Sequence, residues 1–175
     1  MLLTQLPTGL TAGASLREMT LADVPAVHQL ELNLFPADAW PLEMFLAEIT
    51  QETRGYIVLE IPTVQGPEVI GYAGLMSIAE TADVQTIAIA PAYQGRGYGQ
   101  TLLSYLAAEA RARGAEQILL EVRADNPRAQ KLYLKNGYQQ IHLRRRYYND
   151  GVDALIMRKD LTDQPSLQGE SSHDR

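Results

Sequence analysis

The feature that most constrains this chain is a hydrophobic run that leads through a glycine-rich loop into a helical pattern. The run covers residues 84–90, the loop contains Gly95, Gly97 and Gly99, and apolar residues then recur at helical spacing over residues 97–113. The first N–H groups of a helix carry partial positive charge, and glycine lets a ligand approach the backbone closely. We therefore expect an anion-binding loop at this strand-to-helix junction.

Three alternating glycines are a weak signal by themselves, because a tight structural turn needs the same residues. A classical dinucleotide fold would carry Gly-x-Gly-x-x-Gly early in a βαβ unit, whereas these glycines come after mid-chain and have a different spacing. A Walker phosphate loop is excluded, since no Gly-Lys-Ser/Thr follows them. The surrounding sequence has to decide between a plain turn and an anion site.

The rest of the chain is expected to alternate between strands and helices. Strands are predicted at residues 15–19, 55–61, 68–78, 84–90, 117–122, 138–143 and 152–157, and helices at residues 20–34, 41–50, 97–113 and 126–136. Residues 62–67 have the composition of a hairpin loop, and residues 149–151 that of a turn. This order predicts a mixed α/β sheet covered by helices, without a repeat or a second domain.

Length and composition fit one globular domain. The chain has 175 residues, of which 46% are hydrophobic and 21% charged, and we expect the folded domain to cover residues 15–161. Residues 1–14 are expected to be a flexible segment. Residues 162–175 are polar with little to bury, which predicts a disordered tail.

Several classes of protein are disfavoured by what the chain lacks. It has no cysteine, which excludes disulfides, thiolate metal sites and a cysteine nucleophile. It has no signal-peptide pattern and no run approaching the roughly 18 apolar residues of a membrane span, so we expect a cytoplasmic protein with no membrane partner. The net charge of −6 disfavours nucleic acid and favours a basic partner, although small enzymes are commonly acidic.

A second informative stretch surrounds Glu121. Ile118, Leu120 and Val122 alternate onto one face of the predicted strand, which places Glu121 on the other face. A half-buried carboxylate accepts protons more readily, which suits a general base that deprotonates an amine. An ion pair with an arginine such as Arg123 at the end of the sheet explains the same residue equally well.

Both stretches resemble the GNAT superfamily of acetyl-CoA-dependent N-acetyltransferases. Residues 94–99, Gln-Gly-Arg-Gly-Tyr-Gly, are similar to its Q/R-x-x-G-x-G/A pyrophosphate loop. Residues 120–138 match the L-E-V-R-x-x-N-x-x-A-x-x-L-Y-x-x-x-G-F/Y pattern of its RimI-type members nearly throughout. The resemblance implies a GNAT fold, α/β in α+β layers, with a mixed, mostly antiparallel sheet of about seven strands and four helices. It also implies acetyl-CoA as co-substrate.

The resemblance further assigns roles to individual residues. Glu121 would be the general base, with Glu80 and Asp83 as reserve candidates, and Tyr133 the acid that protonates the coenzyme A thiolate; a core tyrosine is the plain alternative for Tyr133. The expected cofactor-binding residues are Ile87, Ala88, Ile89, Gly95, Arg96, Gly97, Tyr98, Gly99, Gln100 and Asn126, the last of which is also explained by helix capping alone. The expected acceptor-binding residues are Phe35 and Trp40, in the predicted loop at residues 35–41, together with Tyr147 and Tyr148.

The implied reaction is direct transfer of the acetyl group to an N-terminal amine of a protein, in the RimI type a small-subunit ribosomal protein. Two alternatives stay open: acetylation of a small amine such as a polyamine or an aminoglycoside, and a coenzyme A-binding module without catalysis. The loop of residues 62–67, the polar tail and Ala90 depart from the RimI pattern. No metal is expected, because His28, His142 and His173 lack ligand spacing, and we expect a monomer or a weak homodimer.

Overall fold

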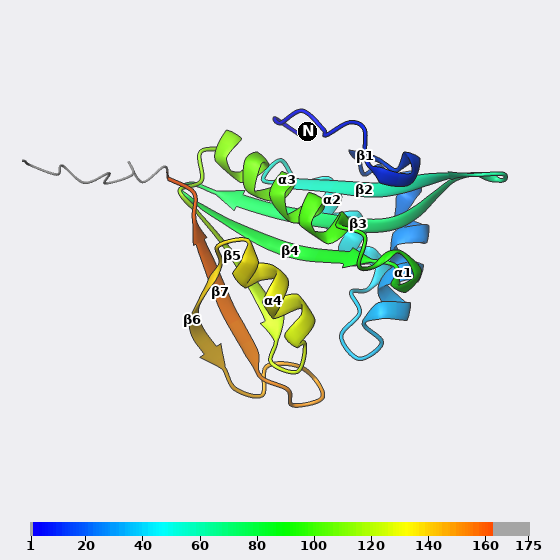
Figure 1. The fold of residues 1–175 in the computed structure, drawn as a ribbon. Coiled ribbons are helices and arrows are strands. Elements are labelled where there is room, and N and C mark those ends of the chain that lie inside the picture. Colours follow the sequence, from blue (N-terminus) through cyan, green and yellow to red (C-terminus); the bar gives the residue numbers. More distant parts are fainter. Residues whose placement is uncertain (1, 163–175) are drawn as a thin grey trace, which may run out of the picture.

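A central sheet of seven strands organises the computed structural model, which describes residues 2–162 (Figure 1). The sheet order is β1-β2-β3-β4-β5-β7-β6, and only the β4–β5 pair is parallel. The strands are β1 (Ser15–Glu18), β2 (Arg54–Thr63), β3 (Gly66–Ile78), β4 (Thr81–Ile89), β5 (Gln117–Arg123), β6 (Gln139–Arg144) and β7 (Ala154–Asp160). The α-helices are α1 (Val24–Leu34), α2 (Leu42–Ile49), α3 (Tyr98–Ala112) and α4 (Pro127–Lys135). The expected mixed, mostly antiparallel sheet with four helices is confirmed. The predicted disordered tail lies outside the described residues, apart from Thr162.

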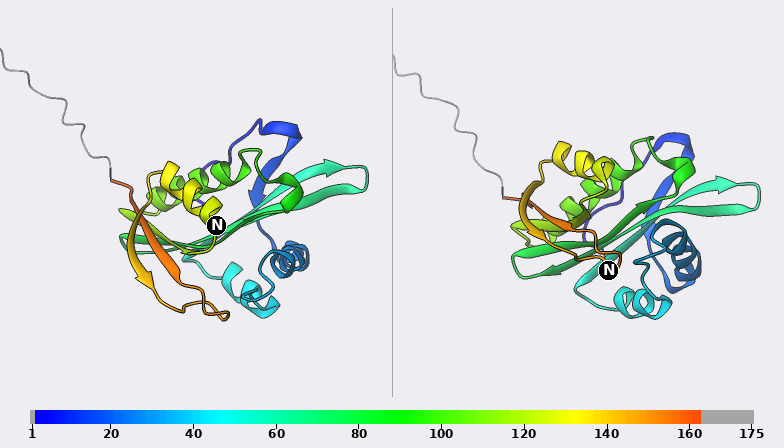
Figure 2. Two further views of the ribbon diagram at one scale, coloured as in Figure 1. Left: turned by 60° about the horizontal axis from the view of Figure 1, so that its bottom comes forward. Right: turned by 90° about the horizontal axis from the view of Figure 1, so that it is seen from below.

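The helices cover the two faces of the sheet in pairs, α3 and α4 on one face and α1 and α2 on the other (Figure 2). The larger core lies under α3 and α4, where Leu102 and Leu106 pack with Ile118 of β5. A smaller core lies under α1 and α2, where Phe45 packs against Tyr72 of β3. Because neighbouring residues of a strand point to opposite faces, the central strands β2, β3 and β4 supply side chains to both cores.

The two halves of the sheet separate at the β4–β5 pair. These strands are in register only from Thr81–Asp83 against Gln117–Leu119. Beyond that point β4 continues along β3 while β5 continues along β7, and the ribbons diverge in Figure 1. In the described part of the chain, residues 84–89 therefore have a strand partner on one edge only, which leaves backbone groups free on the edge that faces β5.

The β2–β3 hairpin is longer than the sequence indicated. Residues 62–67, expected to be a loop, are mostly strand, because Pro62 pairs with Pro67 and Thr63 with Gly66. The turn is reduced to the two residues between Thr63 and Gly66. Proline cannot donate a ladder hydrogen bond, but β2 has no β1 partner beyond Glu60, so this part of the hairpin is an edge where proline is tolerated.

The first helix begins later than predicted. Thr20 donates its backbone N–H to Asp23 Oδ2 at 2.8 Å, and the 3₁₀ turn Leu21–Asp23 precedes α1, which starts at Val24. The carboxylate of Asp23 also pairs with Arg17 at 2.7 Å. The capping motif was therefore located correctly, but it opens a 3₁₀ turn before the α-helix.

Residues 2–14, expected to be flexible, lie against α3. The buried carboxylate of Glu109 accepts the backbone N–H groups of Leu3 at 2.9 Å and Thr4 at 2.8 Å. Tyr105 donates its hydroxyl to Thr4 O at 3.1 Å, and Tyr98 donates to Thr11 O at 2.9 Å. These contacts of high sequence separation have no local signature.

Gly74 permits the closest packing in the sheet, and we expect Gly74→Ala to destabilise the protein. A Cβ atom at Gly74 would lie 2.2 Å from Cε1 of Tyr56 on the paired strand. Displacing that buried ring should lower the free energy of unfolding by about 1 to 3 kcal/mol, which thermal unfolding would detect as a drop of several degrees. In a Tyr56→Ala background the same change should cost much less, because the clashing atoms are gone. An unchanged melting temperature in Gly74→Ala alone would contradict this account.

Candidate active site

The glycine-rich loop presents backbone N–H groups at the start of α3. Gly95 and Gly97 have φ angles of 78° and 87°, a conformation that favours glycine. The first N–H group with an acceptor in the helix belongs to Thr101, which donates to Gly97 O at 3.0 Å. The N–H groups of residues 98–100 have no such acceptor, so they are free to bind an anion. The geometry suits the expected pyrophosphate site.

Arginine side chains lie on both sides of this loop. Arg128, in the first turn of α4, donates to Gln94 Oε1 at 2.9 Å, and Gln94 in turn donates to Ile89 O at 2.9 Å. Arg96 donates to Ala92 O at 3.1 Å. Arg128 was not singled out from the sequence. Arg128 could have been identified from the sequence as a basic residue in the first turn of a helix that faces a glycine-rich loop.

Two side chains of the expected cofactor set are turned away from the loop. Tyr98 is buried and donates its hydroxyl to Thr11 O, while Gln100 accepts a hydrogen bond from Asn136 Nδ2 at 2.7 Å. Only the backbone groups of these two residues remain for a ligand. Asn126 caps α4 as expected, because its side chain accepts the N–H of Ala129 at 3.1 Å.

The open edge of β4 carries the other cofactor-binding candidates. Ile87 packs toward the α3 core, whereas Ala88 belongs to the core under α1 and α2. The residues pair with β3 on one side, so their remaining backbone groups face the gap between β4 and β5. An extended chain such as pantetheine can bind such an edge in the manner of an added strand.

Glu121 projects from β5 on the face opposite the α3 core. Its side chain is 34% exposed and pairs with Arg144 of β6, with Oε1 2.5 Å from Nη1. Tyr147 lies beside the same carboxylate, and a hydrogen bond with Glu121 is the main cause that raises the pKa of this tyrosine. The ion pair with an arginine that the sequence suggested is therefore present, but its partner is Arg144 rather than Arg123.

The reserve candidates Glu80 and Asp83 lie in different places. Asp83 is opposite Leu119 at the point where β4 and β5 separate. Burial raises the pKa of Asp83, and the charge of Glu121 raises it further, which places the two carboxylates in one electrostatic environment. Glu80 lies in the turn before β4, where its carbonyl oxygen accepts the N–H of Glu116 at 2.8 Å. Asp83 is the reserve candidate that faces Glu121.

Tyr133 approaches from the opposite face of the sheet, on α4. It is 6% exposed and packs within the larger core, its ring 6.0 Å from that of Tyr138. Burial raises the pKa of Tyr133 to about 12, with Tyr148 as a second cause. No hydrogen bond of its hydroxyl occurs within residues 2–162. A protonated phenol without a structural partner is available as a donor.

The front loop, residues 35–41, packs its aromatic side chains over the smaller core. The rings of Trp40 and Phe45 are 5.4 Å apart, and Phe35 packs against the same cluster. The backbone N–H of Trp40 donates to the buried carboxylate of Glu31 at 3.1 Å, and Tyr72 donates its hydroxyl to the same carboxylate. Sequence reasoning missed Glu31, because nothing local distinguishes a buried glutamate from an exposed one on a helix.

Tyr147 and Tyr148 lie in the β6–β7 loop, residues 145–153. Their rings are 5.2 Å apart in a T-shaped arrangement, and Tyr147 is 46% exposed. Burial raises the pKa of Tyr148 to about 12, and the charge of Glu121 is the second cause. The two tyrosines thus lie next to Glu121, and their role in acceptor binding stays a prediction.

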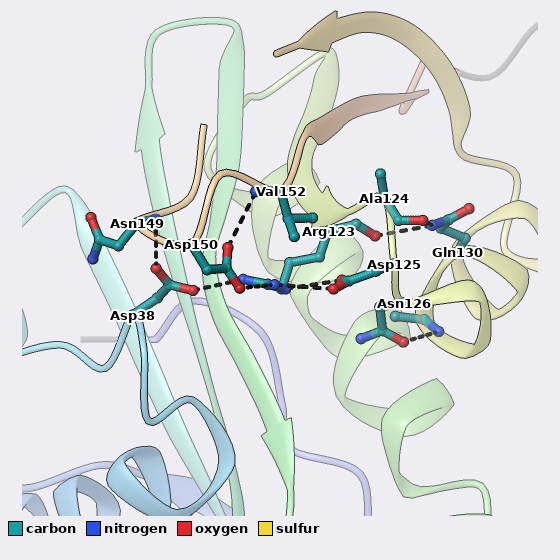
Figure 3. Close-up of polar contacts among 10 residues, drawn as sticks. Asp38, Arg123, Ala124, Asp125, Asn126, Gln130, Asn149, Asp150 and Val152 are labelled. Atoms are coloured by element: carbon teal, nitrogen blue, oxygen red, sulfur yellow. Dashed lines mark hydrogen bonds and ion pairs between the residues drawn. The ribbon is translucent and has the colours of Figure 1, made fainter. Parts of the chain in front are cut away.

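Arg123 connects the front loop with the β6–β7 loop. It contacts Asp38 of the front loop at 2.8 Å and Asp150 of the β6–β7 loop at 2.5 Å, as well as Asp125 at 3.0 Å (Figure 3). Its guanidinium group lies 4.7 Å from the ring centre of Tyr148. The sequence offered Arg123 only as a partner for Glu121, because Asp38 and Asp150 come from loops that are distant in sequence.

Neither a metal-binding cluster nor a membrane-spanning helix occurs within residues 2–162. No group of three or more His, Cys, Asp or Glu side chains within residues 2–162 is arranged to hold a metal ion. None of the helices in that range is long and apolar enough to span a bilayer. The expected absence of a metal stays a prediction.

Known proteins with related sequences share this arrangement of elements. Residues 24–138 match the acetyltransferase (GNAT) family. The N-alpha-acetyltransferase RimI of Mycobacterium tuberculosis is 38% identical over 159 residues, which cover 87% of this chain and 96% of that relative. The ribosomal protein bS18-alanine N-acetyltransferase of Escherichia coli is 31% identical over 148 residues, covering 82% of this chain and 95% of the relative.

A solved structure extends the likeness to the fold. The crystal structure of the ribosomal-protein-S18-alanine N-acetyltransferase from Escherichia coli matches with a TM-score of 0.75 and 29% identity, over 90% of this chain and 99% of that one. The family match includes the glycine-rich loop, the end of β5 and α4.

Proposed function

This chain belongs to the GNAT family of acetyltransferases and is an acetyl-CoA-dependent N-acetyltransferase related to RimI, and on that premise we propose that it acetylates the N-terminal amine of a protein. Ribosomal protein bS18 is the acceptor we favour. The observation that carries this choice is the extent of the likeness to RimI-type relatives, 31% to 38% identity over most of both chains.

The loop before α3 fits the phosphates of acetyl-CoA. The N–H groups of residues 98–100 and the positive end of the helix would bind the pyrophosphate, with Arg96 and Arg128 nearby. The unpaired edge of residues 87–89, apart from Ile89 O, which accepts a hydrogen bond from Gln94, would hold the pantetheine arm, and Asn126 would contact it where α4 begins. Acetyl-CoA supplies the acetyl group as a thioester, which is already activated for attack by an amine.

Two side chains from opposite faces of the sheet support direct transfer. Glu121 would remove the proton from the acceptor ammonium, directly or through water, and the freed amine would attack the thioester carbonyl. Tyr133 would donate to the departing sulfur, so the acetyl carbon gains a C–N bond as its C–S bond breaks. Holding both substrates at near-attack distance can contribute on the order of 7 to 11 kcal/mol, so these residues have to add only part of the rate.

The acceptor would approach from the side of the front loop and the β6–β7 loop. Phe35, Trp40, Tyr147 and Tyr148 offer aromatic walls there, and Glu121 lies beside the two tyrosines. The walls of this side come from loops, which is consistent with a flexible peptide end as the acceptor.

A peptide panel tests the acceptor class. The substrates are a peptide with the first residues of bS18 beginning with alanine and containing one lysine, the same peptide blocked at its N-terminus, spermidine and an aminoglycoside. Thiol release from acetyl-CoA is expected only with the free N-terminus, and fragmentation mass spectrometry should place the acetyl group on that amine. Turnover on spermidine or the aminoglycoside, or acetylation of the lysine in the blocked peptide, would move the assignment to another acceptor class.

A further inference from the structure

We propose that Arg123 is a positioning residue that holds the front loop and the β6–β7 loop together, and that this link sets how tightly the enzyme binds its peptide acceptor. We call Arg123, Asp38 and Asp150 the acceptor bracket. The inference deepens the proposed function and rests on it for the nature of the acceptor.

The bracket joins two loops that are distant in sequence. Nη1 of Arg123 is 2.8 Å from Oδ2 of Asp38, and Nη2 is 2.5 Å from Oδ2 of Asp150. Figure 3 shows both aspartates directed toward the guanidinium group, with Asp125 on its other side. The side chains of Arg123 and Asp38 are each 22% exposed, so solvent screens this pair less than a fully exposed one.

A second set of contacts joins the same loops directly. The backbone N–H of Asn149 donates to Oδ1 of Asp38 at 3.2 Å, and its side-chain amide donates to Ala37 O at 3.1 Å. Asp150 also accepts the N–H of Val152 at 3.2 Å, which fixes the turn of the β6–β7 loop. Asp38 is therefore shared between Arg123 and Asn149, and its removal would break both connections.

The arginine itself is anchored in rigid structure. Arg123 is the last residue of β5, where it pairs with Ala154 of β7. Its carbonyl oxygen accepts the N–H of Asn126 at 3.1 Å and the side chain of Gln130 at 3.0 Å. A planar guanidinium with five donors can bind both aspartates at once, which the single ammonium of lysine does less well.

The acceptor bracket lies next to Glu121, the proposed general base. Arg123 follows Glu121 by two residues on β5, so both side chains project from the same face of the sheet. Tyr148, whose ring lies under the guanidinium, is also influenced by the charge of Glu121. The loops that the bracket joins carry the aromatic residues proposed to line the acceptor site. A loosened bracket would therefore change acceptor binding more than acetyl-CoA binding.

Asp125 supplies a matched control. It contacts Arg123 Nε at 3.0 Å, but it lies two residues away on the same segment and joins no second loop. Its side chain is 55% exposed. Asp38→Ala and Asp125→Ala each remove one carboxylate from Arg123, but only the first removes links between the loops, of which the Asn149 hydrogen bond to Ala37 O then remains.

The experiment measures steady-state constants for the bS18-type peptide and for acetyl-CoA in both variants. If the joined arrangement falls to about a tenth of the molecules, Asp38→Ala should raise the peptide KM about tenfold, because only the competent fraction binds. The KM for acetyl-CoA and kcat should change less than about twofold, and Asp125→Ala should resemble the wild type. Asp38→Glu, which retains the carboxylate, should keep the peptide KM close to the wild-type value. Arg123→Lys should give a peptide KM between those of the wild type and Asp38→Ala.

Hydrogen exchange of the unliganded proteins gives a readout that needs no acceptor. Residues 35–41 and 145–153 should exchange faster in Asp38→Ala than in Asp125→Ala, while α3 stays unchanged. Equal exchange and equal peptide KM in the two variants would overturn the proposal. It would also be overturned if the KM for acetyl-CoA rose in Asp38→Ala as much as the KM for the peptide. If the wild-type enzyme proves to acetylate no peptide, the proposed function fails, and the exchange comparison alone then decides whether the bracket holds the loops.

Discussion

Replacing Glu121 with glutamine should lower kcat/KM by about two to four orders of magnitude, the range expected when a general base is removed. Glutamine has nearly the same shape but cannot take the proton from the acceptor ammonium. The carboxylate pairs with Arg144, which is half exposed, so losing the ion pair should change stability little. Steady-state assays with the N-terminal peptide would measure the loss, and thermal unfolding would verify the fold.

The matched control for this prediction is Asp83→Asn. Asp83 shares the electrostatic environment of Glu121 and is more buried, so it is the residue that would act if Glu121 did not. We expect Asp83→Asn to retain at least about a tenth of the activity, since the proposed base is intact. A near-complete loss of activity in Asp83→Asn, with only a mild loss in Glu121→Gln, would identify Asp83 and not Glu121 as the general base.

Replacing Tyr133 with phenylalanine should lower kcat by about a hundredfold while the KM for both substrates changes little. The variant removes one hydroxyl from a buried ring. That hydroxyl has no hydrogen-bond partner in the described part of the chain, so its loss leaves no orphaned group, and the melting temperature should stay within a few degrees of the wild type. Single-turnover assays would locate the defect in the transfer step.

Tyr138→Phe is the matched control for Tyr133→Phe. Tyr138 is a neighbouring buried tyrosine, 6.0 Å away between ring centres, and its buried hydroxyl has no hydrogen-bond partner within residues 2–162. Removing it should be neutral or slightly stabilising and should leave kcat unchanged. Equal losses of activity in the two variants would show that packing, and not the Tyr133 proton, determines the rate.

The raised pKa of Tyr133 also predicts how kcat depends on pH in the alkaline range. Burial raises this pKa to about 12, so the phenol stays protonated below that value and is lost as a donor only above it. The kcat of the wild type should therefore not fall between about pH 8 and pH 10, and the proton it supplies is present throughout that range. A decline in kcat within that range, absent from Tyr133→Phe, would contradict this assignment of the pKa.

Most of the fold could be predicted because its signals are local. The strand, glycine loop and helix at residues 84–113 follow from periodicity and from glycine at positive φ, and the cap of α4 follows from Asn126 before Pro127. The errors occurred where a distant partner overrides local composition. The prolines of residues 62–67 looked like a loop, but pairing of β2 with β3 makes them strand.

The candidate site was only partly accessible to the same reasoning. Glu121 and Tyr133 were selected from a sequence pattern, and the structure places them on opposite faces of the sheet. Arg144 as the partner of Glu121 could not be foreseen, since it depends on how β6 lies against β7. Arg128 and Glu31 were missed because their partners belong to other elements.

By itself, the sequence determined the order and type of the elements and the resemblance to acetyltransferases, and it predicted an anion-binding loop before α3, since each depends on residues within about a turn or a strand of one another. Only the tertiary structure decided which charges meet. Arg123 contacts aspartates from the front loop and the β6–β7 loop, and residues 2–14 dock on Glu109 of α3. Such pairs depend on how the sheet twists and where its two halves separate, and a contact between segments far apart in the chain leaves no spacing in the sequence from which it can be read.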